Sequence, residues 1–112
     1  MLKSEIGEIL DKHPKWLNVE IGGERADLRY ADLRDANLRD ANLHGADLDF
    51  SCLPLWCGSL GVIVDRRIAA QIAYHFCSLV CDDDEVVHIQ KLLYDFANTF
   101  HRVGEIPRLE GD

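Results

Sequence analysis

Hydrophobic residues recur at every fifth position in the first half of the chain. From Ala26 the sequence reads ADLRY, ADLRD, ANLRD, ANLHG and ADLDF, followed by the degenerate unit SCLPL. Alanine stands first and leucine third in each of the five regular units, and Leu53 continues the leucine positions. A period of five fits neither the 3.6-residue period of an α-helix nor the two-residue period of a strand. The pattern therefore indicates a repeat architecture.

The unit A-(D/N)-L-x-x resembles the pentapeptide-repeat family, clearly over residues 26–50 and loosely over residues 21–55. This resemblance implies a right-handed quadrilateral β-helix with one repeat on each side, short enough here to make about one to two coils. It also implies that leucine fills the narrow interior and that the small alanine packs beside it. Residues twenty positions apart would then be stacked, which gives these neighbours: Arg29 with Asp49, Tyr30 with Phe50, and Asp27 with Asp47.

Members of this family are known to mimic duplex DNA, in particular as protectors of gyrase. One to two coils, stacked at about 4.8 Å, are too few to imitate a DNA segment. Arg29, Arg34 and Arg39 would also point away from different sides of the coil, so they form no continuous basic stripe. We therefore expect neither DNA mimicry nor direct binding of duplex DNA.

Helical periodicity flanks the repeats on both sides. Apolar positions within residues 2–13, followed by Pro14, predict an amphipathic helix that caps the open end of the repeats from residues 1–20. Residues 65–104 carry two amphipathic patterns joined by a short connection, which predicts an antiparallel helical hairpin. The expected fold class is mixed α+β in a single domain, 1–112, with the β-helix over residues 21–55.

The ends of the two predicted hairpin helices carry residues that are typical of helix termini. Asp65 is placed to cap the first helix, and the acidic run 82–85 complements the positive end of the second helix dipole. His101, Arg102 and Gly104 are typical of a helix C-terminus.

Composition narrows the function classes. The 112 residues hold 20 acidic and 12 basic side chains, for a formal net charge of -8. General binding to a phosphate backbone needs a clustered excess of Lys and Arg, so it is not expected. No apolar stretch is long enough to span a bilayer, and no basic region followed by an apolar region opens the sequence. We therefore expect a cytoplasmic protein without membrane contact, in which the four cysteines are reduced.

No pattern of catalytic or metal-binding residues emerges. The cysteines at 52, 57, 77 and 81 lack the paired spacing of a zinc site, and no nucleophile elbow, P-loop or dinucleotide-binding glycine motif is present. We expect no enzyme activity, no cofactor and no metal.

Two functions from different classes remain open. The first is an acidic, non-catalytic interaction protein that binds a partner protein through repeat-face carboxylates. The acidic residues assigned to this surface are Asp27, Asp32, Asp35, Asp40 and Asp47. The chain also resembles, more loosely, pentapeptide-repeat proteins of phages and prophages. This implies an inhibitor whose target is a bacterial defence or nucleic-acid-processing protein, acting in the host cytoplasm.

The second function is a sponge that binds and sequesters a small nucleotide signal. An antiparallel hairpin brings the start of its first helix beside the end of its second, which would gather basic groups there with aromatic rings for base stacking. The residues assigned to this site are Trp56, Arg66, Arg67, Tyr74, His101 and Arg102. Apolar residues on more than one face of the hairpin also predict a homodimer.

Overall fold

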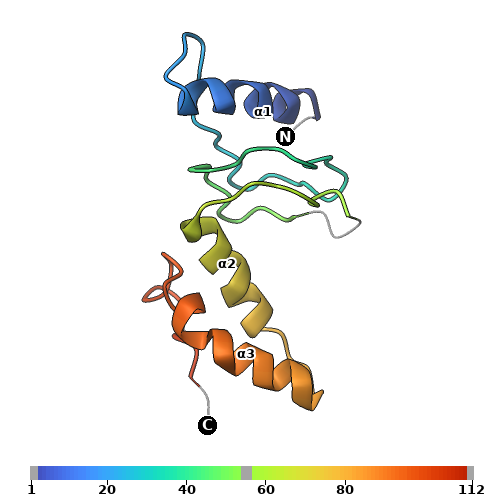
Figure 1. The fold of residues 1–112 in the computed structure, drawn as a ribbon, viewed down its shortest axis with the longest axis vertical. Coiled ribbons are helices and arrows are strands. Elements are labelled where there is room, and N and C mark those ends of the chain that lie inside the picture. Colours follow the sequence, from blue (N-terminus) through green and yellow to red (C-terminus); the bar gives the residue numbers. More distant parts are fainter. Residues whose placement is uncertain (1–2, 54–56, 111–112) are drawn as a thin grey trace. The chain divides into compact units, whose positions relative to one another are not determined.

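The computed structural model describes residues 3–53 and 57–110. Its contacts divide the chain into two compact units, Met1–Asp65 and Arg66–Asp112. The first unit holds helix α1 (Lys3–Leu17) and the repeats, and the second holds helices α2 (Arg66–Cys77) and α3 (Asp84–Ala97) (Figure 1). The single domain expected from the sequence stays a prediction, and each unit is described here by itself.

The expected β-helix is wrong: the described residues contain three helices and no strand or sheet. In place of a sheet, neighbouring passes of the described repeat segment form isolated parallel bridges, such as Asp27 with Asp47 and Asp32 with Cys52. The physical reason is the turn that closes every five-residue unit. Each side of the winding chain keeps only three residues between turns, and only the middle one forms a bridge, so no continuous ladder of paired residues forms.

The repeat segment nevertheless winds with a pitch of twenty residues. We call residues 24–53 and 57–65 the repeat spiral. The amide of Leu28 donates to the carbonyl of Asp47 at 2.9 Å, and the amide of Asp47 donates to the carbonyl of Ala26 at 3.0 Å. These bonds confirm the twenty-residue stacking expected from the sequence, including the neighbours Asp27 and Asp47.

The spiral continues beyond residue 55, where the sequence predicts its end. The amide of Leu38 donates to Gly58 O at 2.7 Å and that of Leu43 donates to Ile63 O at 2.7 Å. At the last position of this pass, the Asp65 carboxylate accepts a hydrogen bond from the amide of Gly45. Residues 57–65 therefore form a second pass under the regular repeats, although they lack the five-residue pattern.

The interior of the spiral is a column of leucines. Leu28, Leu33, Leu38 and Leu43 are all 0% exposed, and Ala26, Ala31 and Ala46 are almost equally buried. This confirms the inward position of leucine and the close packing of alanine. A fully buried leucine contributes about 1.5–3 kcal/mol relative to an exposed one, so the column supplies most of the apolar stabilisation of this unit.

Helix α1 packs on the spiral through a buried histidine. The Nδ1 atom of His13 accepts from the amide of Ala26 at 2.9 Å, so the ring proton lies on Nε2, which donates to the carbonyl of His44 at 2.6 Å. The Trp16 ring stacks on the His13 ring and lies against Gly45. Pro14 lies inside α1, which continues to Leu17, so the expected end at Pro14 is wrong.

In the second unit, α2 and α3 run in opposite directions and pack side by side (Figure 1). Their core contains Tyr74, Cys77, Ala97 and Phe100. Asp83 caps α3 by accepting from the amide of Val86, as the acidic run predicts. The two packed helices are thus as expected, but the expected helix end at His101, Arg102 and Gly104 is wrong, because α3 ends at Ala97 with Asn98 as its cap.

The second unit also contains a C-terminal segment, residues 98–110, that the sequence does not predict. The Tyr74 hydroxyl donates to the carbonyl of Pro107 at 2.6 Å. The Asn98 side chain exchanges two hydrogen bonds with the backbone of Leu109, at 2.8 and 2.9 Å. These bonds hold the segment against one side of the hairpin.

Replacement of His13 by alanine tests the link between α1 and the spiral. We expect His13→Ala to lower the free energy of unfolding by about 1–3 kcal/mol, because it leaves the buried Ala26 amide without an acceptor. His44→Ala is the matched control, since only the backbone carbonyl of His44 takes part. Chemical denaturation measures both, and equal effects of the two variants would contradict the assignment.

Candidate functional site

Each of the five regular repeats ends in a tight turn between its leucine and the next repeat. The leucine carbonyl accepts from the amide three residues later at 2.9–3.1 Å, in five successive turns. The pairs are Leu28 with Ala31, Leu33 with Ala36, Leu38 with Ala41, Leu43 with Ala46, and Leu48 with Ser51. The fifth repeat residue takes a positive φ of 58–79° in four of these turns: Tyr30, Asp40, Gly45 and Phe50. A positive φ at this position defines a type II turn, which favours glycine or asparagine.

Two of the positive-φ positions carry large aromatic side chains. The rings of Tyr30 and Phe50 stack with centroids 4.8 Å apart and planes 10° apart, as the twenty-residue spacing predicts. They are 73% and 53% exposed. The amide of Tyr30 donates to the carbonyl of Asp49 at 3.0 Å, which fixes the two turns against each other. The spiral therefore presents a preorganised pair of aromatic rings to solvent.

The second repeat position has a structural role. Its side-chain oxygen accepts from the amide two residues later at 3.0–3.2 Å in all five repeats. The residues concerned are Asp27, Asp32, Asn37, Asn42 and Asp47. This hydrogen bond needs an oxygen acceptor on a short side chain, which both aspartate and asparagine provide. The preference for D or N at this position is thus explained by the turn rather than by charge.

Two of the repeat carboxylates are also neutralised by arginines of their own repeats. Arg29 binds Asp27 through two hydrogen bonds of 2.8 and 2.9 Å and lies 3.7 Å from Asp47. Arg34 binds Asp32 in the same way, with a closest distance of 2.8 Å. The twenty-residue spacing does not predict these pairings within one repeat, because it considers only stacked positions.

These pairs change the titration of both carboxyls. Hydrogen bonds from the Arg29 side chain, and then from its amide, lower the pKa of Asp27 from 3.8 to about 2. Arg34 lowers the pKa of Asp32 in the same way to about 2, with a further hydrogen bond from Cys52. Of the acidic residues assigned to a protein-binding surface, Asp27, Asp32 and Asp47 are therefore engaged, whereas Asp35 is exposed and Asp40 packs against Gly61.

The residues assigned to nucleotide binding lie in different surroundings, and Trp56 lies outside the described residues. Arg66 lies 4.8 Å from the centre of the Phe96 ring, so the start of α2 is close to the end of α3 as expected. Arg67 and His101 are exposed, and His101 packs edge-on against Phe100. No described contact brings His101 to Arg66 and Arg67, so nucleotide binding at this end stays a prediction.

The other two residues of this set have structural partners. Arg102 pairs with Glu105 at 3.2 Å. Tyr74 is 8% exposed in the core of the second unit, where its ring packs on Phe100. Stacking of a base needs an open ring face, so the packing of α2 on α3 and the C-terminal segment removes Tyr74 from that role.

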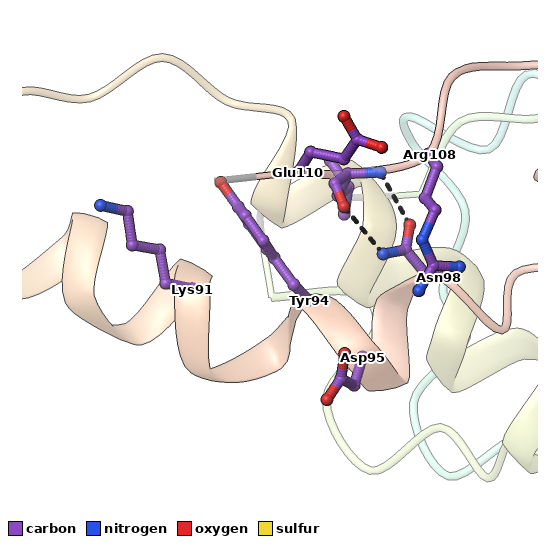
Figure 2. Close-up of a pocket in the computed structure, with 7 residues that line it drawn as sticks. Lys91, Tyr94, Asp95, Asn98, Arg108 and Glu110 are labelled. Atoms are coloured by element: carbon purple, nitrogen blue, oxygen red, sulfur yellow. Dashed lines mark hydrogen bonds between the residues drawn. The ribbon is translucent and has the colours of Figure 1, made fainter. Parts of the chain in front are cut away.

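A pocket of about 360 Å³ lies between α3 and the C-terminal segment, where sequence reasoning placed no site. Its lining residues are Lys91, Tyr94, Asp95, Asn98, Arg108, Leu109 and Glu110. Figure 2 shows these side chains around the paired hydrogen bonds of Asn98. Two cations and two carboxylates line the pocket, so it has no excess of either charge. The pocket forms because residues 98–110 fold back on α3, and no sequence pattern predicts this fold-back.

The cysteines and histidines form no site for a metal ion within the part of the chain that the structure describes. Cys52, Cys57 and Cys81 are exposed free thiols, whereas Cys77 is buried. Burial raises the pKa of the Cys77 thiol, and its Sγ atom contacts the carbonyl of Gln90 at 3.4 Å. Cys77 is therefore a core residue. None of the described helices combines the length and apolarity that crossing a membrane requires.

Turns of five residues wound around a leucine column define a repeat protein of very short period. The family model of pentapeptide repeats matches residues 24–54, in 8 copies, so this part of the chain consists of pentapeptide repeats. No curated protein and no solved structure matches the chain. The narrower resemblance to phage-type members stays a prediction.

Removal of the Arg29 guanidinium tests the ion pair with Asp27. The pair stabilises the ionised carboxylate, so its contribution is present above about pH 4 and is lost as the pH falls through about 2. In Arg29→Ala we expect the Asp27 pKa to rise toward 3.8. Carboxyl NMR titration measures this shift, and the Asp32 pKa, held by Arg34, is the internal control. An unchanged Asp27 pKa in the variant would refute the pairing.

The hydrogen bond of the second repeat position is tested at Asn42, which pairs with the amide of His44 at 3.0 Å. Asn42→Asp retains an acceptor and should leave the free energy of unfolding nearly unchanged. Asn42→Ala removes the acceptor and should lower it by about 1 kcal/mol. Thermal and chemical denaturation compare the two variants. A loss of equal size in both would show that the side-chain oxygen is not what the turn requires.

Proposed function

We propose that this protein is a non-catalytic interaction protein that acts by occupying the surface of a partner protein. The observation that carries the proposal is the exposed Tyr30–Phe50 pair, held on a rigid spiral with its rings already stacked. Tyrosine and other aromatic residues dominate the energetics of protein interfaces. A ring that is fixed before binding loses little conformational entropy when the complex forms.

The backbone at these two positions gives a second line of support. Tyr30 and Phe50 occupy turns with φ of 63° and 62°, where glycine would relieve strain. The aromatic side chains are thus present against the backbone preference, and their exposure means that they add little to the core. Strain retained at an exposed position is typical of functional sites.

The charge of the chain indicates the chemistry of the partner. With a formal net charge of -8, the protein favours partners whose apolar surface is bordered by basic groups. A role as inhibitor follows if that surface is the partner's working site. The narrower prediction, a bacterial defence or nucleic-acid-processing target, rests on the phage-type resemblance alone.

The proposed surface differs from the one expected from the sequence, because the rings replace the repeat carboxylates as the main contact. Asp27 and Asp32 already bind arginines of their own repeats, so their charges are compensated before a partner arrives. The alternative function, a nucleotide sponge, stays a prediction. No described contact favours it, since Tyr74 is buried and Arg102 pairs with Glu105.

Glycine substitutions at both rings provide the test. Tyr30→Gly with Phe50→Gly removes the rings and suits the positive φ at both positions, so the spiral should remain folded. A partner captured with the wild-type protein from its own cells should bind this variant about 30-fold more weakly, as expected for hot-spot residues. Calorimetry with the purified partner measures the change, and circular dichroism checks the fold.

Asp35→Ala is the matched control, because Asp35 occupies the same repeat position on another side of the spiral. We expect it to keep nearly full affinity. The role of the rings is overturned if the double-glycine variant binds the partner fully and Asp35→Ala does not. That result would show that the repeat carboxylates make the contact. Native mass spectrometry of the purified protein gives a further check. A bound mass of a few hundred daltons would favour the nucleotide sponge instead.

A further inference from the structure

The helical hairpin of the second unit has an apolar face with four exposed residues beside Phe76 and Phe96, which are partly buried. On α3 the stripe consists of Ile89, Leu92 and Phe96, which share one side of the helix at spacings of three and four residues. On α2 it consists of Ile72 and Phe76, four residues apart, and Leu79 continues it in the connection that follows the helix. Ile72, Leu79, Ile89 and Leu92 are between 41% and 70% exposed.

Both stripes lie on the side of the hairpin opposite the C-terminal segment. That segment contacts α2 at Tyr74 and α3 at Asn98. At about 100° per residue, the α2 stripe lies on the far side of the helix from Tyr74, and the α3 stripe lies on the far side from Asn98. One face of the hairpin is therefore covered by its own chain, whereas the other, which we call the open face, is apolar across both helices.

The two ends of the open face have opposite charge. The acidic run 82–85, which is exposed throughout, spans the end of the connection and the first turn of α3. At the other end, Arg66 and Arg67 are exposed at the start of α2, and Arg66 lies over the ring of Phe96 near the end of α3. The hairpin thus has an acidic tip and a basic base, about three helical turns apart.

We propose that the open face binds the open face of a second copy of this chain, with the two hairpins antiparallel. In this arrangement the acidic tip of each hairpin lies against the basic base of the other, so the two-fold axis uses each charge contact twice. The four helices would bury the two apolar stripes together, as in a four-helix bundle. This inference concerns the second unit and does not rest on the proposed role of Tyr30 and Phe50.

The charge pattern favours a second copy of this chain as the partner of the open face. It also favours the antiparallel orientation of the two hairpins. A parallel pairing would place tip on tip and base on base, with like charges in contact at both ends. The antiparallel pairing satisfies both ends with the same two groups. A face whose own charges complement each other under two-fold rotation needs no other partner to compensate them.

The first experiment introduces a charge at the centre of the open face. Leu92→Glu should raise the dimer dissociation constant by about 100-fold or more, because each dimer would bury two unpaired carboxylates. Lys91→Glu is the matched control, since Lys91 is the neighbouring residue but lines the pocket on the other side of α3. Sedimentation velocity measures both, and circular dichroism checks folding, which the exposure of Leu92 favours. A monomeric wild type, or equal effects of both variants, overturns the proposal.

The second experiment tests the antiparallel arrangement by exchanging charges. One variant carries Arg66→Glu and Arg67→Glu at the base, and the other carries Asp82→Arg and Glu85→Arg at the tip. Asp83 is left in place because it caps α3. Each variant alone should dimerise at least about tenfold more weakly than the wild type.

An equal mixture of the two variants should regain dimers. The reversed base of one then meets the reversed tip of the other, and the remaining base and tip are unchanged. Native mass spectrometry of isotope-labelled and unlabelled chains distinguishes the mixed dimer from the two homodimers. Failure of the mixture to form mixed dimers, when the wild type dimerises, overturns the antiparallel arrangement.

Discussion

The hydrogen bond from each leucine carbonyl to the first amide of the next repeat is the constraint on which the first unit depends. It closes a turn after every fifth residue, and it occurs at all five regular corners at 2.9–3.1 Å. Because each turn redirects the chain by about the same amount, all the leucines point toward one axis. Leu28, Leu33, Leu38 and Leu43 then exclude water completely, and only a small residue such as alanine fits next to them.

The same turn explains both what could be predicted from the repeat segment and what could not. The five-residue period and the family resemblance predict the inner leucines and the stacking of residues twenty apart, including Tyr30 on Phe50. They also suggested strands, which the described residues lack. The turns leave room for isolated bridges such as Asp27 with Asp47, but not for a second consecutive pair. A repeat pattern thus predicts the positions of the turns well. It predicts the backbone conformation between the turns less well.

Where the five-residue pattern ends, prediction from sequence loses its basis. Residues 57–65 join the spiral through backbone bonds such as that from Leu38 to Gly58, which depend on no particular side chain. The fold-back of residues 98–110 depends on single contacts, those of Tyr74 with Pro107 and Asn98 with Leu109. Neither contact has a local signature in the sequence, whereas the helices and the cap of Asp83 are encoded by periodicity and by neighbouring residues.

Each position of a repeat has its own structural role, and these roles determine which side chains are available to contact a partner. The first and third positions form the interior, and the second position satisfies the amide of the fourth residue with its own oxygen. Second-position side chains such as Asp27 are still partly exposed, but their oxygens are occupied, which leaves recognition mainly to the fourth and fifth positions. At the fourth position Arg29 and Arg34 turn back to neutralise Asp27 and Asp32, which removes four charges from the surface available to a partner.

The fifth position is therefore the place where one repeat can differ from another without cost to the turn's hydrogen bonds. It holds Asp35 on one side of the spiral and the rings of Tyr30 and Phe50, one above the other, on another. Such a pair forms only when two aromatic residues stand twenty positions apart in successive passes. A single substitution at either position removes the stacked pair. An exposed ring pair in these positions contributes little to folding, because the leucine column is complete without it. The binding role that we propose would account for it.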